Sequence, residues 1–376
     1  MKKSIKQRNR ICVYCDTWGQ GGVETFIAET LTHMDCTDFE FRLICAEKQE
    51  SHLDIRLSKH DLYMQPLLKG QGMSALQKTV CSIKPLLRFC RQEQISVLHF
   101  NIFHGVSLLQ AAAARLCGVK HIIVHSHGAG LRDSSGLKIK LLGHYVFRWL
   151  FSWVATERWA ASKEAAKFLF GNRNVQIIPN GVETSRFLFC KEIRHTLRQR
   201  LQAEKRLVLG CVGRIDTQKN QQFLLILLSI LKQRGSNAML LLIGDGEGRA
   251  TLEKRVIEMG LKGDVVFLGI SNRVNEWMCA MDQLLIPSLS EGLSIAAIEG
   301  QASGLAVLCS TGVPREVQLS ELVCFLPLTS LEQWVHTVEN PPVCNRTAMN
   351  IRISKSRYNI TQSAVFIKSL YQKNCI

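Results

Sequence analysis

The sequence predicts an α/β protein built from two Rossmann-like domains, each with a doubly wound parallel sheet. The first reason is length, because 376 residues exceed one ordinary core and suit two domains of under about 200 residues each. The second reason is the repeated alternation of short apolar runs with helical patterns along the chain. This alternation is typical of parallel βαβ units.

The first domain is expected to span residues 1–182. Apolar runs predict its strands, and periodic apolar positions between those runs predict its helices. The strands are expected at residues 10–16, 39–46, 97–100, 122–125 and 175–178. The helices are expected at residues 23–33, 74–92 and 105–116, and Ser162 is expected to cap a further helix.

The second domain is expected to span residues 183–355, and residues 356–376 are expected to form a C-terminal helix. A charged helical linker is predicted at residues 191–206. Strands are expected at residues 207–212, 240–243, 265–269 and 305–308, with another ending at Pro287. Helices are expected at residues 222–231 and from about Leu293 to Gly304.

The loop between Pro287 and Leu293 carries the strongest chemical signal. In a βαβ unit it lies at the carboxyl end of its strand, where open α/β sheets bind ligands. The N–H groups of Gly292 and Leu293 would open the following helix towards an anion. Glu291 in the loop and Glu299 about two turns further on would reach different parts of one elongated ligand. The alternative is that both glutamates are ordinary helix charges.

Three further segments are candidates for a site. Gly21 and Gly22 form a turn after the first strand, where backbone can approach a phosphate, but their spacing is not that of a dinucleotide fold. His125 and His127 end a strand, and each is either a metal ligand or a hydrogen-bonded loop histidine. In the loop that begins at Gly213, two cations can converge on a diphosphate. These cations are Arg214 and Lys219.

Taken together, these segments resemble the retaining glycosyltransferases of family 4, whose GT-B fold has two Rossmann-like domains facing across a cleft. The resemblance covers nearly the whole chain, and Pro179-Asn180-Gly181-Val182 stands where the family joins its domains. One departure is Gly300, where the family usually has Ala. The matching segments are Gly21-Gly22-Val23-Glu24, His127-Gly128, Gly213-Arg214 with Lys219-Asn220, Gly244-Asp245-Gly246, Ser290-Glu291-Gly292-Leu293-Ser294 and Ile298-Glu299-Gly300.

The resemblance implies a role for each of these positions. Glu291 and His127 would contact the donor sugar, Glu299 would hold the ribose, and Arg214 and Lys219 would clamp the diphosphate. His125 is expected to orient its loop. The remaining donor-binding positions, implied to lie near the phosphates or the nucleotide, are Gly21, Gly22, Gly213, Gly244, Gly246, Gly292 and Leu293.

The resemblance also implies a reaction. A sugar would move with retention from a UDP- or GDP-sugar to an acceptor hydroxyl. The chain resembles bacterial members that extend capsule or exopolysaccharide, so the expected acceptor is a lipid-linked glycan such as a polyprenyl diphosphate. No Asp-x-Asp motif occurs, so we expect no metal and no other cofactor. The alternatives are a nucleotide-sugar-binding protein without turnover and a nicotinamide-dependent oxidoreductase, which the missing glycine motif disfavours.

Charge and cysteine content bear on partners and location. The net charge is +16, and the basic first domain predicts anionic partners. Nucleic acid is not expected, because aromatic and basic residues are not interleaved and no binding motif occurs. The fourteen scattered cysteines and the lack of a signal segment predict reduced thiols in a cytoplasmic protein. The basic first domain is expected to make peripheral contact with the inner face of the cell membrane.

The apolar run at residues 141–155 predicts a helix with two possible settings. Lys140, His144, Arg148 and Ser152 would form one polar stripe on a surface otherwise covered by apolar and aromatic side chains. We expect this helix to be buried between the layers of the first domain. The alternative is a membrane-surface helix that serves a lipid-linked acceptor.

Overall fold

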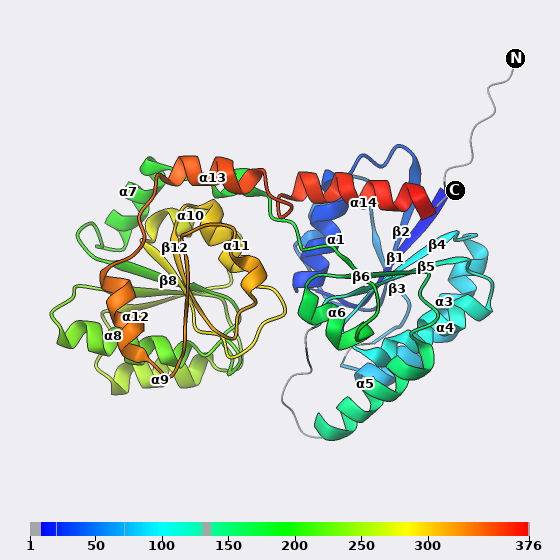
Figure 1. Cartoon of the computed structure of the whole chain (residues 1–376), viewed down its shortest axis with the longest axis horizontal. Helices are drawn as coiled ribbons and strands as arrows, with labels where there is room; N and C mark the ends of the chain where they lie inside the picture. Colours follow the sequence, from blue (N-terminus) through cyan, green and yellow to red (C-terminus); the bar gives the residue numbers. More distant parts are fainter. Residues whose placement is uncertain (1–8, 20, 71, 129, 131–136, 375–376) are drawn as a thin grey trace, which may run out of the picture. The chain divides into compact units, whose positions relative to one another are not determined.

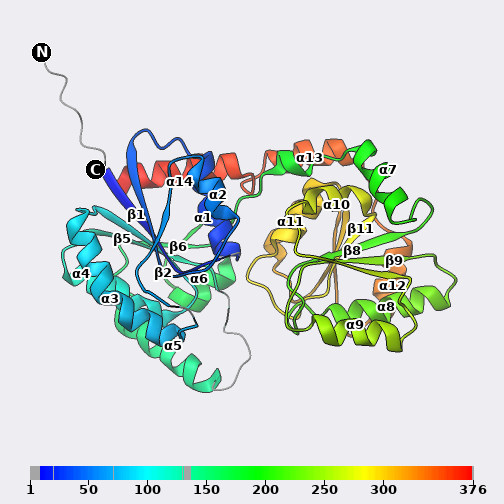
Figure 2. The same cartoon turned by 180° about the vertical axis from the view of Figure 1, so that it is seen from behind.

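The computed structural model describes residues 9–19, 21–70, 72–128, 130 and 137–374, and it divides the chain into two compact units. Unit 1 comprises Met1–Gly181 and Ile360–Ile376, and unit 2 comprises Val182–Asn359. Within each unit a twisted sheet lies between two layers of helices (Figure 1 and Figure 2). The α/β fold class predicted from the sequence is confirmed.

In the described part of unit 1, the sheet has seven parallel strands in the order β3-β2-β1-β4-β5-β6-β7. The order reverses between β1 and β4, so the carboxyl ends of these two strands flank the position where doubly wound sheets bind ligands. The strands are β1 (Asn9–Trp18), β2 (Phe39–Lys48), β3 (Met64–Pro66), β4 (Val97–Ile102), β5 (His121–Ser126), β6 (Glu157–Ala160) and β7 (Gln176–Ile177).

Helices cover both faces of this sheet because successive side chains of each strand point to opposite faces. In β1, Ile11 and Val13 pack into the core under one helix layer, whereas Cys12 and Tyr14 pack into the core under the other. The first layer contains α1 (Gly22–His33), α2 (Leu53–Ser58) and α14 (Ile360–Asn374). The second contains α3 (Ala75–Gln92), α4 (Leu108–Leu116), α5 (Leu137–Phe151) and α6 (Lys163–Phe170).

The described sheet of unit 2 has six parallel strands in the order β10-β9-β8-β11-β12-β13, and it reverses between β8 and β11. Its strands are β8 (Val208–Val212), β9 (Met239–Ile243), β10 (Val265–Gly269), β11 (Gln283–Ile286), β12 (Ala306–Ser310) and β13 (Val323–Leu326). One core lies under α10 (Val274–Ala280), α11 (Ile295–Ala302) and α13 (Arg346–Ser354). The other lies under α8 (Gln221–Gln233), α9 (Arg249–Glu258) and α12 (Leu331–Glu339).

The segment predicted as a charged helical linker is helical over part of its length, as α7 (Lys191–Arg200), and belongs to unit 2. Arg194 donates to Asp282 at 2.5 Å, and Arg198 binds the other oxygen of the same carboxylate. Asp282 also accepts from the backbone N–H of Val208 at 2.8 Å. The predicted helix is confirmed, but the linker role was wrong, because these charges pair with a carboxylate across the fold and hold the helix against unit 2.

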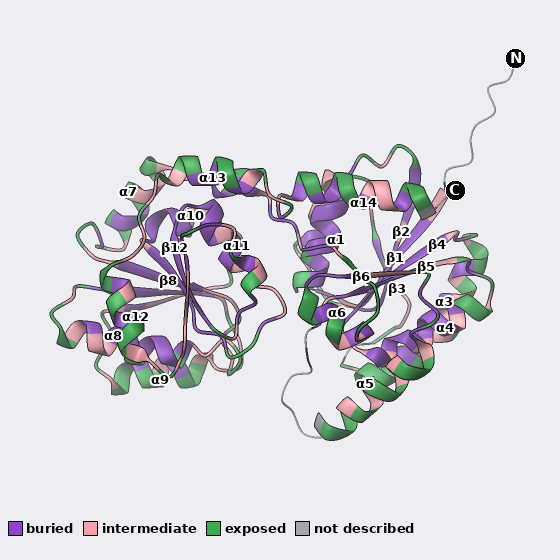
Figure 3. Cartoon of the chain, viewed as in Figure 1, coloured by how far each residue is buried: buried purple, intermediate pink, exposed green. Residues whose placement is uncertain are grey.

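The helix expected within residues 141–155 is α5, and the prediction that it is buried between layers is also wrong. Trp149 is 78% exposed and Trp153 is 59% exposed, and much of the length of α5 is exposed in Figure 3. His144 and Ser152, from the predicted polar stripe, are buried instead. Within the described residues, no helix has the length and apolar character that crossing a membrane requires.

Candidate functional site

Three loops of unit 2 meet at the carboxyl edge of its sheet, because β9, β8 and β11 are neighbours and run parallel. They follow β8 (residues 213–220), β9 (residues 244–248) and β11 (residues 287–294). The first and last flank the point where the strand order reverses. This is the position at which open α/β sheets bind ligands.

Lys219 and Glu291 form the central contact between these loops. The ammonium Nζ of Lys219 lies 2.9 Å from Oε1 of Glu291, whose side chain is almost fully buried. The hydroxyl of Ser288 donates to the same oxygen at 2.5 Å. An ammonium has three donors, so Lys219 can hold Glu291 and still offer N–H groups to an anion.

Asp216 organises the loop that carries both predicted cations. One of its oxygens accepts from the backbone N–H of Lys219 at 2.8 Å, and the other lies 3.2 Å from Nε of Arg214. The Arg214 side chain is about half exposed. Its guanidinium is therefore oriented by Asp216 and remains open to a ligand.

The loops after β8 and β11 are also joined directly. Asn220 adopts a left-handed conformation with φ 55°, and its side chain donates to the carbonyl of Pro287 at 3.1 Å. Gln218 donates from its side chain to the carbonyl of Ser290 at 2.6 Å. These bonds hold the loop that carries Lys219 against the loop that carries Glu291.

The glycines of the site are required where two loops approach each other closely. A Cβ on Gly244 would lie 2.0 Å from the carbonyl oxygen of Gly213, and a Cβ on Gly246 would lie 2.4 Å from that of Ile215. Gly213 and Gly244 also have φ of +146° and +136°, which side chains rarely tolerate. Packing between the loops after β8 and β9 therefore explains these glycines without a ligand.

The expected helix start after Glu291 is displaced. The helix α11 begins at Ile295 with Ser294 as its N-cap, so Gly292 and Leu293 lie in the loop before it. The prediction that their N–H groups open the helix was wrong, because the chain stays non-helical up to Ser294. Glu299 lies in the second turn of α11 and is half-buried.

In unit 1, His127 lies at the carboxyl edge of the sheet, directly after β5. Its backbone N–H donates to the carbonyl of Ile102 at 3.0 Å, and its Nε2 lies 3.0 Å from Oδ1 of Asn101. Asn101 donates in turn to the carbonyl of Tyr14 at 3.3 Å, so its Oδ1 is the acceptor towards the ring. The proton of the neutral imidazole is therefore on Nε2.

His127 is the outermost ring of a histidine cluster. The rings of His125 and His127 are 4.1 Å apart, and His125 stacks on His99 at 5.5 Å. Burial lowers the pKa of His127 and His99 to about 3 and lowers that of His125 well below its ordinary value. These histidines are neutral at pH 7. Since the Nε2 proton of His127 is donated to Asn101, only Nδ1, which is buried and has no hydrogen-bond partner among the described residues, could accept from a hydroxyl group, and the ring supplies no charge.

Gly21 and Gly22 lie at the start of α1, as predicted, and Gly21 is its N-cap. The carboxylate of Glu24 folds back towards Gly21, since a Cβ on Gly21 would lie 2.4 Å from its Oε2. Burial raises the pKa of Glu24. A phosphate that approaches this turn would meet a carboxylate, so the phosphate-binding role of both glycines stays a prediction.

Sequence reasoning missed the residues that position the predicted ones. Ser288, Asp216 and Asn101 each touch or orient a predicted site residue. A partial signal existed, since Ser288 and Asn101 stand at or just beyond the ends of strands, where ligand sites gather. Asp216 stands three residues before Lys219 in a loop, a spacing at which an aspartate often caps backbone N–H groups.

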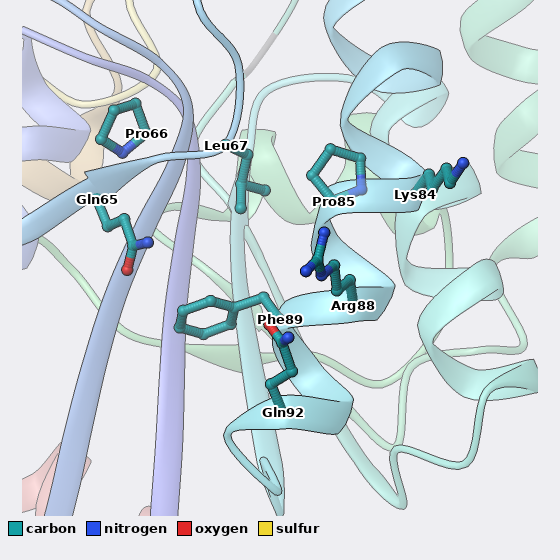
Figure 4. A pocket seen from close by; sticks show the side chains of 8 residues that line it. All are labelled: Gln65, Pro66, Leu67, Lys84, Pro85, Arg88, Phe89 and Gln92. Atoms are coloured by element: carbon teal, nitrogen blue, oxygen red, sulfur yellow. The ribbon is translucent and has the colours of Figure 1, made fainter.

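A separate hollow of about 330 Å³ contains none of the predicted site residues. It lies in unit 1 between the end of β3 and the outer part of α3 (Figure 4). Its lining includes Lys84 and Arg88 from α3 and Gln65 from β3. This hollow is not part of the candidate site.

Comparisons with known proteins agree along most of the chain. Residues 20–186 match the family described as Glycosyltransferase Family 4, and residues 193–321 match the family described as Glycosyl transferases group 1. A Bacillus subtilis protein named as the glycosyltransferase EpsF is 29% identical over 87% of this chain and 86% of its own. An Escherichia coli enzyme is 25% identical over 77% of this chain and 76% of its own. Its name is UDP-Gal:alpha-D-GlcNAc-diphosphoundecaprenol alpha-1,3-galactosyltransferase.

Solved structures show the same fold at low sequence identity. The structure of HepE from Anabaena in complex with UDP-glucose has a TM-score of 0.77 and 16% identity, covering 96% of this chain and 99% of that one. Sucrose-phosphate synthase from Thermosynechococcus elongatus has a TM-score of 0.79 and 15% identity, covering 97% of this chain and 99% of that one.

Proposed function

We propose that this chain, which is a glycosyltransferase with the GT-B fold, transfers a sugar with retention from a nucleoside-diphosphate sugar to an acceptor hydroxyl. The observation that carries the proposal is the Lys219–Glu291 contact between the loops after β8 and β11. It combines a cation for a diphosphate with a carboxylate for sugar hydroxyls at the ligand-binding edge of the sheet.

Each charged group of this edge suits one part of the donor. When the bond between the sugar and the diphosphate breaks, its electron pair stays on the leaving diphosphate. Lys219 and Arg214 would stabilise that charge because Asp216 and Glu291 already orient both cations. Glu299 would bind the ribose hydroxyls, as the resemblance to family 4 implies.

The neutral His127 would bind the transferred sugar. A neutral imidazole exchanges hydrogen bonds with hydroxyl groups without attracting the diphosphate away from the cations. The acceptor oxygen would form the new bond to the sugar carbon that the diphosphate leaves. Its proton would pass to an oxygen of the leaving diphosphate.

The proposed donor is a UDP- or GDP-sugar, and the proposed acceptor is a lipid-linked glycan in the synthesis of an exopolysaccharide or capsule. The names of the relatives support this choice, because the Escherichia coli enzyme uses UDP-Gal and a diphosphoundecaprenol acceptor. Such an acceptor would place the protein in the cytoplasm, at the inner face of the cell membrane. We further propose that no metal takes part, since Arg214 and Lys219 supply positive charge to the diphosphate.

Calorimetry with UDP and GDP tests the donor site. We expect Lys219→Ala and Glu299→Ala each to weaken binding of the preferred nucleotide by about tenfold or more, because each removes a charged hydrogen-bonding group. Lys232→Ala is the matched control, since Lys232 pairs with Asp264 at the far end of α8 and should leave binding unchanged. Unchanged binding in both test variants would show that the donor site lies elsewhere.

Transfer itself needs a second assay, with labelled nucleotide sugars and polyprenyl-diphosphate glycans as acceptors. We expect product in the presence of excess EDTA, at the same rate as without it. Loss of transfer that added Mg²⁺ or Mn²⁺ restores would contradict metal independence. Nucleotide-sugar binding with no transfer to any acceptor would identify a binding protein without turnover.

A further inference from the structure

The helix α5 presents its polar side to the protein. His144 is fully buried, where its Nδ1 accepts from the backbone N–H of Gly105 at 2.9 Å. Its Nε2 donates to the carbonyl of Phe168 at 3.0 Å, and Arg148 donates to the same carbonyl at 2.9 Å. These bonds fix the rotation of α5 about its axis.

The opposite side of α5 is therefore apolar and faces outward. Along it, side chains recur at intervals of three and four residues, as on one face of a helix. The largest is Trp149, at 78% exposed, and the stripe continues into the turn after the helix. The exposed apolar residues are Ile139, Leu142, Tyr145, Val146, Trp149, Leu150 and Trp153.

An exposed apolar stripe of this length marks a surface that binds something. Monomeric soluble proteins rarely leave apolar patches of more than a few hundred Å² in contact with water. Tryptophan and tyrosine are enriched where one side of a ring meets hydrocarbon and the other meets polar groups. The stripe has three such rings, those of Tyr145, Trp149 and Trp153.

Charge indicates which partner fits. Three of the four helices of this layer, α3, α4 and α5, together carry eight Lys and Arg and no Asp or Glu, and the fourth, α6, carries two Lys and Glu164. Lys138 and Lys140 are exposed beside the apolar stripe, and Lys84 and Arg88 line the hollow on α3 (Figure 4). Such a layer attracts an anionic surface, whereas two copies of this layer would repel each other.

We propose that the apolar stripe of α5 inserts into the headgroup region of an anionic membrane, with the basic residues of α3 and α5 contacting lipid phosphates. An α-helix of this size is about 22 Å long, too short to span a bilayer, so it would lie in the plane of the interface. This inference deepens the proposed function and rests on it for the membrane location, and it assigns lipid contact to a surface that contains none of the donor-site residues.

Sedimentation with lipid vesicles tests the inference on the whole chain. Vesicles of phosphatidylcholine alone and vesicles that also contain phosphatidylglycerol would be compared at low and high salt. We expect the protein to sediment with the anionic vesicles and to be released by salt, and we expect the tryptophan fluorescence to shift to the blue on binding. Protein that stays in the supernatant with both kinds of vesicle would overturn the proposal.

Two variants and one control distinguish vesicle binding through the stripe from nonspecific binding through other exposed apolar residues. Replacing both tryptophans, in W149S/W153S, should weaken binding to anionic vesicles by at least about tenfold. Replacing Lys138→Glu with Lys140→Glu should weaken anionic binding by about tenfold and leave binding to neutral vesicles unchanged. The control is I55S/V365S, which removes two equally exposed apolar residues from α2 and α14 and should bind like the parent.

The competing occupant is a second copy of the chain. If sedimentation equilibrium showed a dimer that W149S/W153S dissociates, the stripe would be a subunit interface and the membrane proposal would fall. Equal vesicle binding by W149S/W153S and the parent would also overturn it. UDP calorimetry on W149S/W153S should match the parent, so failure of the donor-site proposal and failure of this one give different results.

Discussion

At the scale of single residues, burial decides which side chains carry charge. Lys219 keeps a carboxylate partner at 2.9 Å inside its loop cluster, so each of these two groups lies beside a group of opposite charge. His99 in β4, His125 in β5 and His127 just after β5 have no carboxylate partner among the described contacts, and burial lowers their pKa values. One edge thus supplies charge and the other supplies neutral hydrogen-bonding groups.

The lowered histidine pKa values predict acid sensitivity. An unfolded histidine titrates near 6.5, whereas folded His127 titrates at about 3, so protons bind the unfolded state first as pH falls. The contribution of this histidine to the unfolding free energy is fully present above about pH 6.5 and is lost progressively towards pH 3. Between about pH 7 and about pH 5, proton uptake by the unfolded state should lower the unfolding free energy by about 2 kcal/mol for each such histidine.

Urea denaturation at these two pH values measures the effect. His127→Gln removes one titrating group and should reduce the pH dependence by up to about 2 kcal/mol. His60→Gln, at an exposed position, is the control and should leave it unchanged. An unaltered pH dependence in His127→Gln would show that the ring is not neutralised by burial.

At the scale of elements, the helix starts follow from local hydrogen bonds where a capping side chain is present. In α3 the hydroxyl of Ser74 accepts from the N–H of Gln77 at 3.3 Å, and the side chain of Gln77 accepts from the N–H of Ser74 at 3.0 Å. Ser294 and Ser330 stand at the N-caps of α11 and α12 but make no such bond. A serine in the sequence is therefore a weaker guide to a helix start than its contacts.

This contrast gives a matched pair of variants. Ser74→Ala should lower the unfolding free energy by about 1 kcal/mol, because the backbone N–H of Gln77 loses its acceptor. Ser330→Ala should change it by no more than a few tenths of a kcal/mol, since its side chain caps nothing. Thermal or urea denaturation compares the two. Equal losses in both would contradict the capping argument.

At the scale of the whole molecule, the chain leaves unit 1 at Gly181 and returns to it at Ile360. The returning helix α14 packs against α1, and Ile367 and Tyr371 enter the core beneath it. The hydroxyl of Tyr371 lies 2.6 Å from Nδ1 of buried His99. The last residues of the chain thus complete the first core.

Truncation after Asn359 tests this dependence. Without α14, unit 1 should lose several kcal/mol of stability, because buried apolar side chains contribute roughly 1.5–3 kcal/mol each. Hydrogen exchange should rise at least about tenfold in α1 and β2 and stay unchanged in β8 and β9. Val365→Ser, at a 64% exposed position on α14, is the control and should exchange like the parent. Faster exchange in β8 as well would contradict two separate cores.

The order of residues alone predicted most of the elements, because strand and helix periodicities are local. Those periodicities predicted the α/β class, and motif spacing predicted the glycosyltransferase family; both are confirmed. The roles of the individual site residues stay predictions. Sequence reasoning placed the start of α11 about two residues early. It predicted the helix α7 but took it for a linker, since its ion-pair partner comes from another part of the fold.

Long-range packing decided what local pattern could not. Lys219 and Glu291 are far apart in the sequence, and they meet because β8 and β11 became neighbours in the sheet. The pattern of α5 showed a polar side and an apolar side but not which one faces the protein. Acceptors at Gly105 and Phe168 turned the polar side inward, because a buried histidine must find hydrogen-bond partners, and that left two tryptophans in contact with solvent.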